Sequence, residues 1–365
     1  MALKFVGLET KIIDFGTKII NRLGQIGACA FGIAMLTLPN IYALDNKDLA
    51  QKKDGRTEED KEEFSERVFF VRNGYPSRDV YFTAPDFMTV TKYDTPGLDE
   101  RDICFSADGS TAVFTSGWRA YVGDASWKDP QPITREGMVV AHTAVSPSGT
   151  QVAFSRGGEV YVVNKDGTGL RKVTVKEEKI GGDGEPCWNP VGDKIVFTRT
   201  TSLETNIYIV RSDGTDNPTQ LTWSLDARHP AWDPTGEWIA FVADQINEET
   251  KRDVLGNPLQ DKSGKQIKER IRTPDVFMTG TRRGGWRQLT DSWADLRSWY
   301  IGKLSWSPKG DKLVLEAHPK NESFERLYVI DVNKRDITKN LKDTGIIGMS
   351  PVWTYIPKSA LEKAK

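Results

Sequence analysis

Trp188-Asn-Pro-Val-Gly192-Asp-Lys-Ile195-Val-Phe197 places a tryptophan before a tight turn that ends in glycine and leads into a short apolar run. Further copies of this pattern begin with an aromatic or apolar residue at Phe105, Val145, Trp232 and Trp306, and successive copies are 40, 43, 44 and 74 residues apart. A repeat of roughly 40 residues that contains several short strands is typical of a β-propeller, in which four-stranded blades surround a central channel.

Each repeat contains four predicted strands, here called A to D in chain order. In the repeat around Trp188, strand A ends at the tryptophan, strand B is Lys194–Thr198, strand C is Asn206–Arg211, and strand D ends at Gln220-Leu-Thr222. Apolar alternation interrupted by Asp-Gly turns is the pattern of an antiparallel meander.

The two ends of the repeat region complement each other. Met349–Pro357 has the pattern of a further strand A, and Val68–Arg72, Asp79–Thr83 and Met88–Lys92 supply three strands without one. Together they make a sixth blade, which closes the ring and leaves no open sheet edge. The sequence therefore predicts an all-β, six-bladed propeller over residues 68–357, closed by both termini, with a C-terminal tail at 358–365.

The repeat also carries a family resemblance. The stretch from Trp188 to Phe197, followed by Ile207-Tyr-Ile-Val210, Asp213-Gly214 and Leu221-Thr222, resembles the propeller repeat of the TolB family. The resemblance covers residues 68–357 and implies a periplasmic protein of envelope-spanning complexes whose partner is an envelope protein. Members of that family carry an α/β domain before the propeller, and this chain has a short charged segment there instead.

The N-terminal residues have the pattern of a targeting segment. Four basic residues precede the apolar run Ile26–Leu38, and Ala43 is a small residue at a plausible cleavage point. Residues 1–43 are therefore predicted to be a signal peptide, and the mature chain to be periplasmic or extracellular and not integral to the membrane. The alternative is an uncleaved anchor or an amphipathic helix, although the 13 apolar residues fall short of the ~20 that span a bilayer.

Composition limits the partners. Residues 44–67 are charged and almost free of large apolar side chains, as expected of a flexible tether. The chain has 50 Lys and Arg residues against 51 acidic ones, which argues against a nucleic-acid partner. Cys104 and Cys187 lie in blades too far apart to form a disulfide and are predicted to be buried free thiols in a monomer.

One repeat position concentrates the polar residues. It lies at the start of strand A, on the face made by the B–C loops and the D–A connections, and it should surround the channel mouth. In blade order it is occupied by Asp102, His142, Glu185, His229, Lys303 and Ser350, here called the ring residues. Its first four members are metal-binding types, so a divalent metal is one hypothesis and no other cofactor is required. The alternative is that they bind backbone groups of neighbouring blades.

The same face carries the irregular segments. A 27-residue insertion, 247–273, separates strands B and C of the fourth blade, with seven basic and five acidic residues and a predicted hairpin around Asp261–Gly264. Exposed Trp, Tyr and Arg residues often anchor partners. The candidate ligand-binding residues of these segments are Arg228, Trp293, Arg297, Trp299, Tyr300 and His318. Trp299 and Tyr300 could instead pack onto the blades.

Catalytic motifs are absent: the sequence has no Gly-x-Ser-x-Gly, phosphate-binding loop, His-Glu-x-x-His or Cys-x-x-Cys. No catalytic residue is therefore assigned. The sequence favours an exported TolB-like propeller that acts as a protein- or glycan-binding scaffold in the cell envelope. The alternative is a metal-assisted carbohydrate-active enzyme, similar to a lyase, that uses Asp102, His142, Glu185 and His229.

Overall fold

A computed structural model describes residues 64–363, except 75–76, 94–97, 176–179, 224–225, 256, 282–284, 292–298 and 320–321. The chain divides into two units, Met1–Asp45 and Asn46–Lys365, and every described residue belongs to the second. The predicted signal peptide and most of the predicted tether lie outside the described residues. Within the described part of the chain, no helix is long and apolar enough to cross a bilayer.

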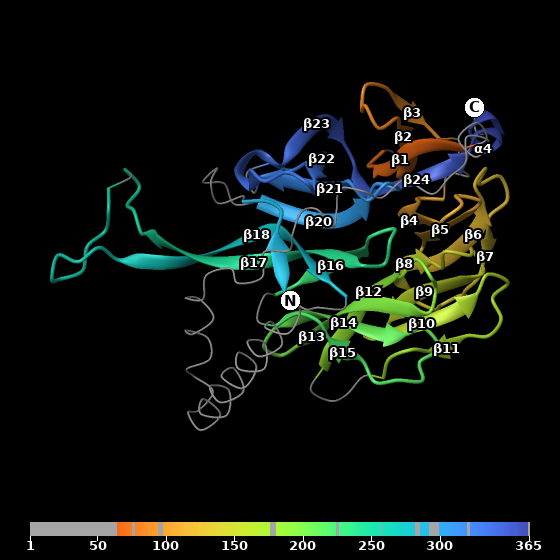
Figure 1. The fold of residues 1–365 in the computed structure, drawn as a ribbon, viewed down its shortest axis with the longest axis horizontal. Coiled ribbons are helices and arrows are strands. Elements are labelled where there is room, and N and C mark those ends of the chain that lie inside the picture. Colours follow the sequence, from red (N-terminus) through yellow and green to blue (C-terminus); the bar gives the residue numbers. More distant parts are fainter. Residues whose placement is uncertain are drawn as a thin grey trace, which may run out of the picture. The chain divides into compact units, whose positions relative to one another are not determined.

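The described residues form six antiparallel four-stranded sheets arranged as blades (Figure 1). Blade 1 contains β4 (Arg101–Phe105), β5 (Thr111–Ser116), β6 (Arg119–Asp124) and β7 (Gln131–Pro132). Blade 2 contains β8 (Ala141–Val145), β9 (Gln151–Arg156), β10 (Glu159–Asn164) and β11 (Arg171–Lys172). Blade 3 contains β12 (Ile180–Trp188), β13 (Lys194–Thr201), β14 (Thr205–Arg211) and β15 (Thr219–Gln220). Blade 4 contains β16 (Arg228–Trp232), β17 (Trp238–Thr250), β18 (Lys268–Gly280) and β19 (Trp286–Gln288). Blade 5 contains β20 (Trp299–Trp306), β21 (Lys312–Pro319), β22 (Arg326–Asp331) and β23 (Lys342–Ile347), with the 3-10 helix η4 (Ile337–Lys339) before β23.

Blade 6 is built from both ends of the chain, which confirms the predicted closure. Its order is β24 (Met349–Pro357), β1 (Phe64–Arg72), β2 (Asp79–Thr83) and β3 (Val90–Lys92). Strand β1 begins at Phe64 rather than at the predicted Val68, because its first four residues pair with the C-terminal half of β24. The Trp353 indole N–H donates to Glu66 Oε1 at 2.8 Å, so part of the predicted tether belongs to the sheet.

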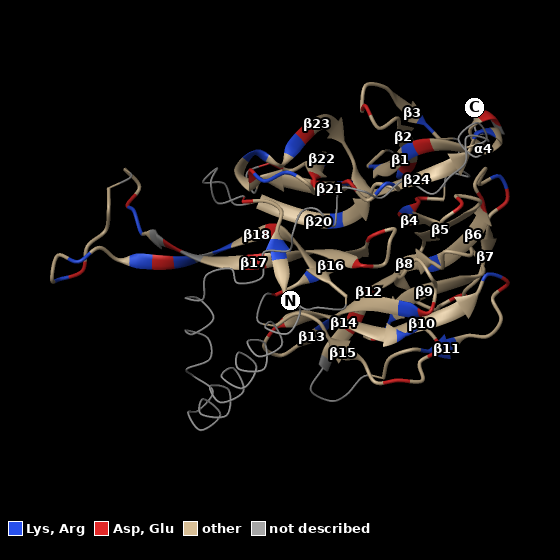
Figure 2. Cartoon of the chain, in the orientation of Figure 1, with Lys and Arg blue, Asp and Glu red and all other residues tan. Residues whose placement is uncertain are grey.

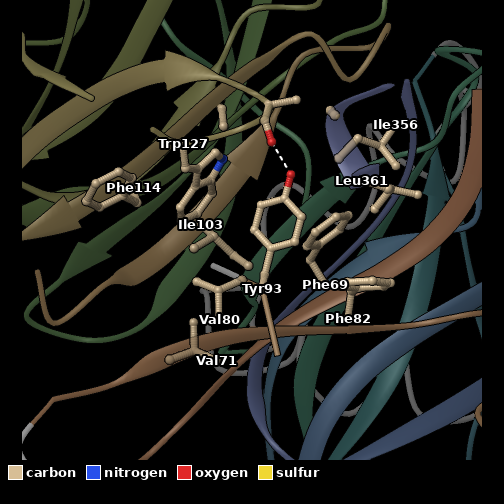
Figure 3. Packing of buried hydrophobic residues seen from close by; sticks show 13 residues of the cluster. Phe69, Val71, Val80, Phe82, Tyr93, Ile103, Phe114, Trp127, Ile356 and Leu361 are labelled. Carbon is tan, nitrogen blue, oxygen red and sulfur yellow. Dashed lines mark hydrogen bonds between the residues drawn. The ribbon is translucent and has the colours of Figure 1, made fainter. Parts of the chain in front are cut away.

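The predicted C-terminal tail also takes part in the fold. Residues 358–363 form the short helix α4 (Lys358–Lys363). Its Ala360 and Leu361 are buried in the cluster between blades 6 and 1, which is built around Tyr93 and Trp127 (Figure 3). Apolar burial of this kind recurs between successive blades, so the core of the propeller is a set of inter-blade layers around the axis.

The predicted insertion extends strands B and C of blade 4 into a long β-ribbon. Strands β17 and β18 pair continuously from Trp238↔Gly280 to Thr250↔Lys268 and project beyond the blades (Figure 1). The expected turn at Asp261–Gly264 is present, with the Gly264 N–H donating to the Asp261 carbonyl at 3.0 Å. We call residues 245–273 the arm and residues 251–267 its tip.

Candidate functional site

The innermost strand of every blade contains a bulge where the ring residues lie. In each blade the pairing of this strand with its neighbour shifts register across the ring position. The backbone there is left-handed, with φ between 49° and 53°, at Asp102, His142, Glu185, His229 and Ser350. A bulge re-aims side chains, and left-handed backbone at non-glycine residues stores strain that often marks functional sites.

The ring residues line one cavity. It has a volume of about 750 Å³ and runs along the axis past a second layer of small side chains at Cys104, Ala144, Cys187, Ala231, Ser305 and Val352. Both cysteines are free, as predicted, and they are partly rather than fully buried. Burial raises the pKa of the Cys104 thiol to about 12, so this thiol is protonated at neutral pH.

Carboxylates at the ring reach across to the next blade. Glu185 Oε1 lies 2.8 Å from His229 Nδ1, and Glu185 Oε2 accepts the His229 backbone N–H at 2.7 Å. In the same way, Asp102 Oδ2 accepts the Thr143 N–H at 2.6 Å. The bulge in the neighbouring blade leaves one backbone N–H without its β-sheet hydrogen bond, and the carboxylate accepts a hydrogen bond from that N–H instead.

A third carboxylate of this kind comes from strand β21. Glu316 accepts the N–H of Ser350 in the next blade and, at 3.2 Å, that of Lys303 in its own. A side chain at Gly302 would collide with this carboxylate, so the glycine allows its close approach. Burial raises the pKa of Glu316. Glu316 was not among the predicted site residues, because nothing in the local pattern links it to a backbone group 34 residues away.

The Glu185 carboxylate is strongly stabilised as an anion. Burial alone would raise its pKa, but the hydrogen bonds and the charge of His229 outweigh burial and lower the pKa to about 2. His142, on the other neighbouring blade, contributes in the same direction. Glu185 is thus an anion with a histidine on each side.

Lys303 spans the closing blade. Its Nζ donates to Asp102 Oδ1 at 3.0 Å and to the Ile103 carbonyl at 3.2 Å, so a side chain of blade 5 reaches blade 1 past the strand β24. Burial opposes the charged form of Lys303, but the charge of Asp102 prevails and the pKa is raised. This ion pair links the two blades that flank the composite blade.

The four metal-ligand candidates do not converge. Asp102 is engaged by Lys303, and Glu185 is engaged by His229. His142 is exposed, and its Nδ1 lies 3.1 Å from Ser155 Oγ. In the described ranges, no three His, Cys, Asp or Glu side chains are placed to hold one metal ion. The arrangement fits the alternative interpretation, in which the ring carboxylates bind backbone groups of neighbouring blades.

Two exposed aromatic side chains flank the cavity mouth. Trp118, in the turn that joins β5 to β6, is 60% exposed and has a φ of 66°. Tyr300, from blade 5, is 42% exposed, and its ring stacks on His318 with centroids 5.2 Å apart. Both line the cavity. A bulky residue with positive φ is rare, so the Trp118 backbone is strained while its indole faces solvent.

Known structures share this architecture, although no protein-family model matches the sequence. TolB from Acinetobacter baumannii matches with a TM-score of 0.56 and 17% identity, over 79% of this chain and 66% of that TolB. A putative TolB from Agrobacterium tumefaciens gives 0.52 and 15%, over 81% of this chain and 98% of that one. The protein is a TolB-like six-bladed propeller. A chain of a nidogen/laminin complex also matches, with a TM-score of 0.54 and 12% identity over 80% of this chain and 98% of that one.

The other candidate residues of this TolB-like propeller are placed as follows. Trp299 is buried and packs edge-on against Tyr328 at 5.4 Å, which is the packing alternative. Arg228 forms an ion pair with Asp244 at 3.0 Å, at the base of the arm. Trp293 and Arg297 lie outside the described residues. Trp118 was missed, although the short Ser116-Gly-Trp-Arg119 turn between two strands leaves a tryptophan little room to point inward.

Proposed function

We propose that this TolB-like propeller is an exported binding module of the cell envelope that captures a protein segment at the mouth of its axial cavity. The observation that carries the proposal is the pair of exposed aromatic residues, Trp118 and Tyr300, at the rim of a cavity of about 750 Å³. Exposed Trp and Tyr side chains beside a concave site are typical anchors for a partner. Two further observations support it: the fold is shared with TolB and with a chain from a nidogen/laminin complex.

The ring residues would shape the cavity rather than hold the ligand. Asp102, Glu185 and Lys303 already bind groups of the protein. Trp118, Tyr300 and His142 are among the exposed residues that line the cavity, whereas the exposed Arg101 is already paired with Asp99. An inserted segment would therefore be held mainly by aromatic contacts, with a rim of polar groups.

Site-specific photocrosslinking tests this proposal. A photoreactive amino acid at position 118 is expected to capture a defined polypeptide from envelope extracts. The matched control places the same amino acid at Val191, which is 81% exposed in an A–B turn on the opposite face. Equal capture at both positions, or capture of glycan alone at 118, would contradict the proposed protein ligand.

Export is tested separately. The N-terminus of the protein recovered from the periplasm or medium is expected to begin after Ala43. An intact N-terminus in the membrane fraction would instead establish the anchor. Neither result depends on the partner.

Catalysis is the second candidate, and one observation favours it. His229 lies in the cavity wall and is oriented by the Glu185 carboxylate, as a general base is oriented by an acidic partner. Substituting His142 and His229 together would abolish turnover of a carbohydrate substrate if the site is catalytic. If only binding occurs there, the double substitution would weaken partner capture at position 118 and there would be no turnover to lose. Metal analysis before and after chelation decides whether a divalent ion takes part.

A further inference from the structure

Beyond its base, the arm has no sheet neighbour within the described part of the chain. Beyond the register pair Val242↔Val276 it has two strands and no further sheet neighbour, and Figure 1 shows it leaving the blades. An isolated two-stranded ribbon is at best marginally stable in water. We therefore expect the arm to be stabilised by contact with another surface.

The base of the arm is fixed in direction. Arg228 pairs with Asp244 at 3.0 Å, and Arg272 pairs with Asp226. Both ion pairs connect the ribbon to the segment that precedes the ring residue His229. The tip is therefore presented at a defined position relative to the ring face of blade 4.

The tip is itself ordered by backbone hydrogen bonds. The Lys251 N–H donates to Ile267, and the Leu259 N–H donates to Lys251, both at 2.8 Å. Further on, the Asp253 N–H donates to the Asn257 carbonyl and the Asp261 N–H donates to the Lys265 carbonyl, each at 2.9 Å. The exposure of the tip side chains is thus set by a defined backbone.

The tip combines apolar exposure with positive charge. Val254 is fully exposed and Leu255 is 82% exposed, and both follow Asp253 directly. Residues 251–267 contain four basic residues (Lys251, Arg252, Lys262 and Lys265) and two acidic ones (Asp253 and Asp261), a net charge of +2. Figure 2 shows these charges along the arm.

Both acidic side chains at the tip face inward to its turns. Asp253 Oδ1 accepts the N–H groups of Leu255 and Asn257, each at 2.9 Å. Asp261 Oδ1 accepts those of Ser263 and Lys265 at 2.8 and 3.1 Å. These hydrogen bonds lower the pKa of Asp261. Both carboxylates are thus occupied by backbone N–H groups of the tip. A surface that approaches the tip would therefore contact mainly Val254, Leu255 and the basic side chains.

We propose that the arm tip docks on a membrane surface rich in anionic lipid, with Val254 and Leu255 entering the headgroup region and Lys251, Arg252, Lys262 and Lys265 facing lipid phosphates. A convex apolar tip needs a deformable partner, and a fluid bilayer interface provides one. Apolar contact and electrostatic attraction to anionic headgroups together give interfacial binding, and either alone is weak. The TolB-like propeller would then be held at the membrane by the arm.

Vesicle co-sedimentation of the full-length protein tests this. Vesicles of phosphatidylcholine with roughly a third phosphatidylglycerol are expected to bind the wild type more tightly than pure phosphatidylcholine, in a salt-sensitive way. V254S/L255S should weaken binding roughly tenfold or more through lost apolar contact. K262Q/K265Q should weaken it roughly 25-fold, because each cation near an anionic surface contributes about fivefold.

Matched controls are available on the same chain. V191S/L203S removes one exposed valine and one exposed leucine from other turns, and K165Q/K194Q removes two exposed lysines from the opposite face. Both should bind vesicles as the wild type does. Binding losses equal to those of the tip variants would overturn the proposal.

Hydrogen exchange separates the tip from any contribution of the N-terminal residues. Amides of residues 251–267 are expected to gain protection when anionic vesicles are added. Unchanged exchange at the tip would overturn the proposal even if the protein sediments. Protection that appears at high protein concentration without vesicles would identify a second copy as the occupant and would overturn it as well.

Discussion

At the scale of single residues, Trp118 has a strained backbone and a side chain that is mostly exposed to solvent. Its φ of 66° is costly for a residue with a Cβ, and its indole is 60% exposed. Replacing it with glycine removes the strain but also gives up the buried two-fifths of the side chain. In denaturant titrations, Trp118→Gly is therefore expected to lower the free energy of unfolding by about 1 kcal/mol less than glycine does at an unstrained tryptophan of similar exposure, and it should weaken capture of the partner at the cavity mouth.

The matched control for that substitution is Trp223→Gly. Trp223 is 63% exposed and is not among the residues with positive φ. Glycine should therefore relieve no strain there and lower the free energy of unfolding by the larger amount. Equal losses of stability in the two variants would show that strain at Trp118 contributes nothing.

Glu185 makes a pH-dependent contribution. Its pKa falls from 4.5 to about 2 on folding, so its stabilising effect is complete above pH 4.5 and is lost as the pH falls towards 2. Glu185→Gln should lower the free energy of unfolding at neutral pH, by about 3 kcal/mol at most. The difference between the two proteins, measured by denaturant titration, should shrink between these pH values. A difference that is constant with pH would mean that packing, not charge, is responsible.

The residues show what the sequence could reveal about the site. The ring register was predictable because each blade repeats the same turn, so equivalent positions could be aligned within one chain. Pairings between blades were not, because Lys303 meets Asp102 from 201 residues away, and no local pattern encodes that contact. The bulges were also missed, since bulged strands keep nearly the same apolar alternation as regular ones.

At the scale of elements, the arm is the clearest difference from the sequence prediction. Six blades could be counted from turns and alternation, yet within the insertion only a hairpin around Asp261–Gly264 was predicted, not the continuous extension of both strands. Its strands are solvated on both faces, so they lack the one-sided apolar alternation by which strands are recognised. The opposite error occurred at the ends, where Phe64–Arg67 and α4 were assigned to a tether and a tail.

Removing most of the arm should leave the propeller folded. Deletion of residues 247–271 with an Asn-Gly join keeps the pair Gln245↔Thr273 and the buried Thr273 and Asp275. Stability to denaturant is expected to stay within about 1 kcal/mol of the wild type. Vesicle binding should be lost and crosslinking at position 118 retained. Loss of the fold would show that the arm supports blade 4.

At the scale of the whole molecule, the circle of six blades does not require the chain to begin in any particular blade. Its closure joins β24 to β1 by hydrogen bonds where other blades use a turn. A circular permutant that links residue 363 to Phe64 by a Gly-Ser segment and opens the exposed turn at Asp213–Gly214 should therefore fold and unfold in one transition. A permutant opened inside β14, between Tyr208 and Ile209, is the control and should not fold. Failure of both would imply that the original closure is required.

The same closure has a mechanical consequence. In the ladder between β1 and β24, Phe64 lies opposite Pro357, so both chain ends leave blade 6 at the same end of the ladder. Tension applied between the two termini would separate these residue pairs one after another, beginning at Phe64↔Pro357. The last pair of that ladder to separate, Val71↔Met349, lies beside Ser350 at the cavity. The cavity wall would therefore keep its shape until the closing blade had almost completely peeled apart.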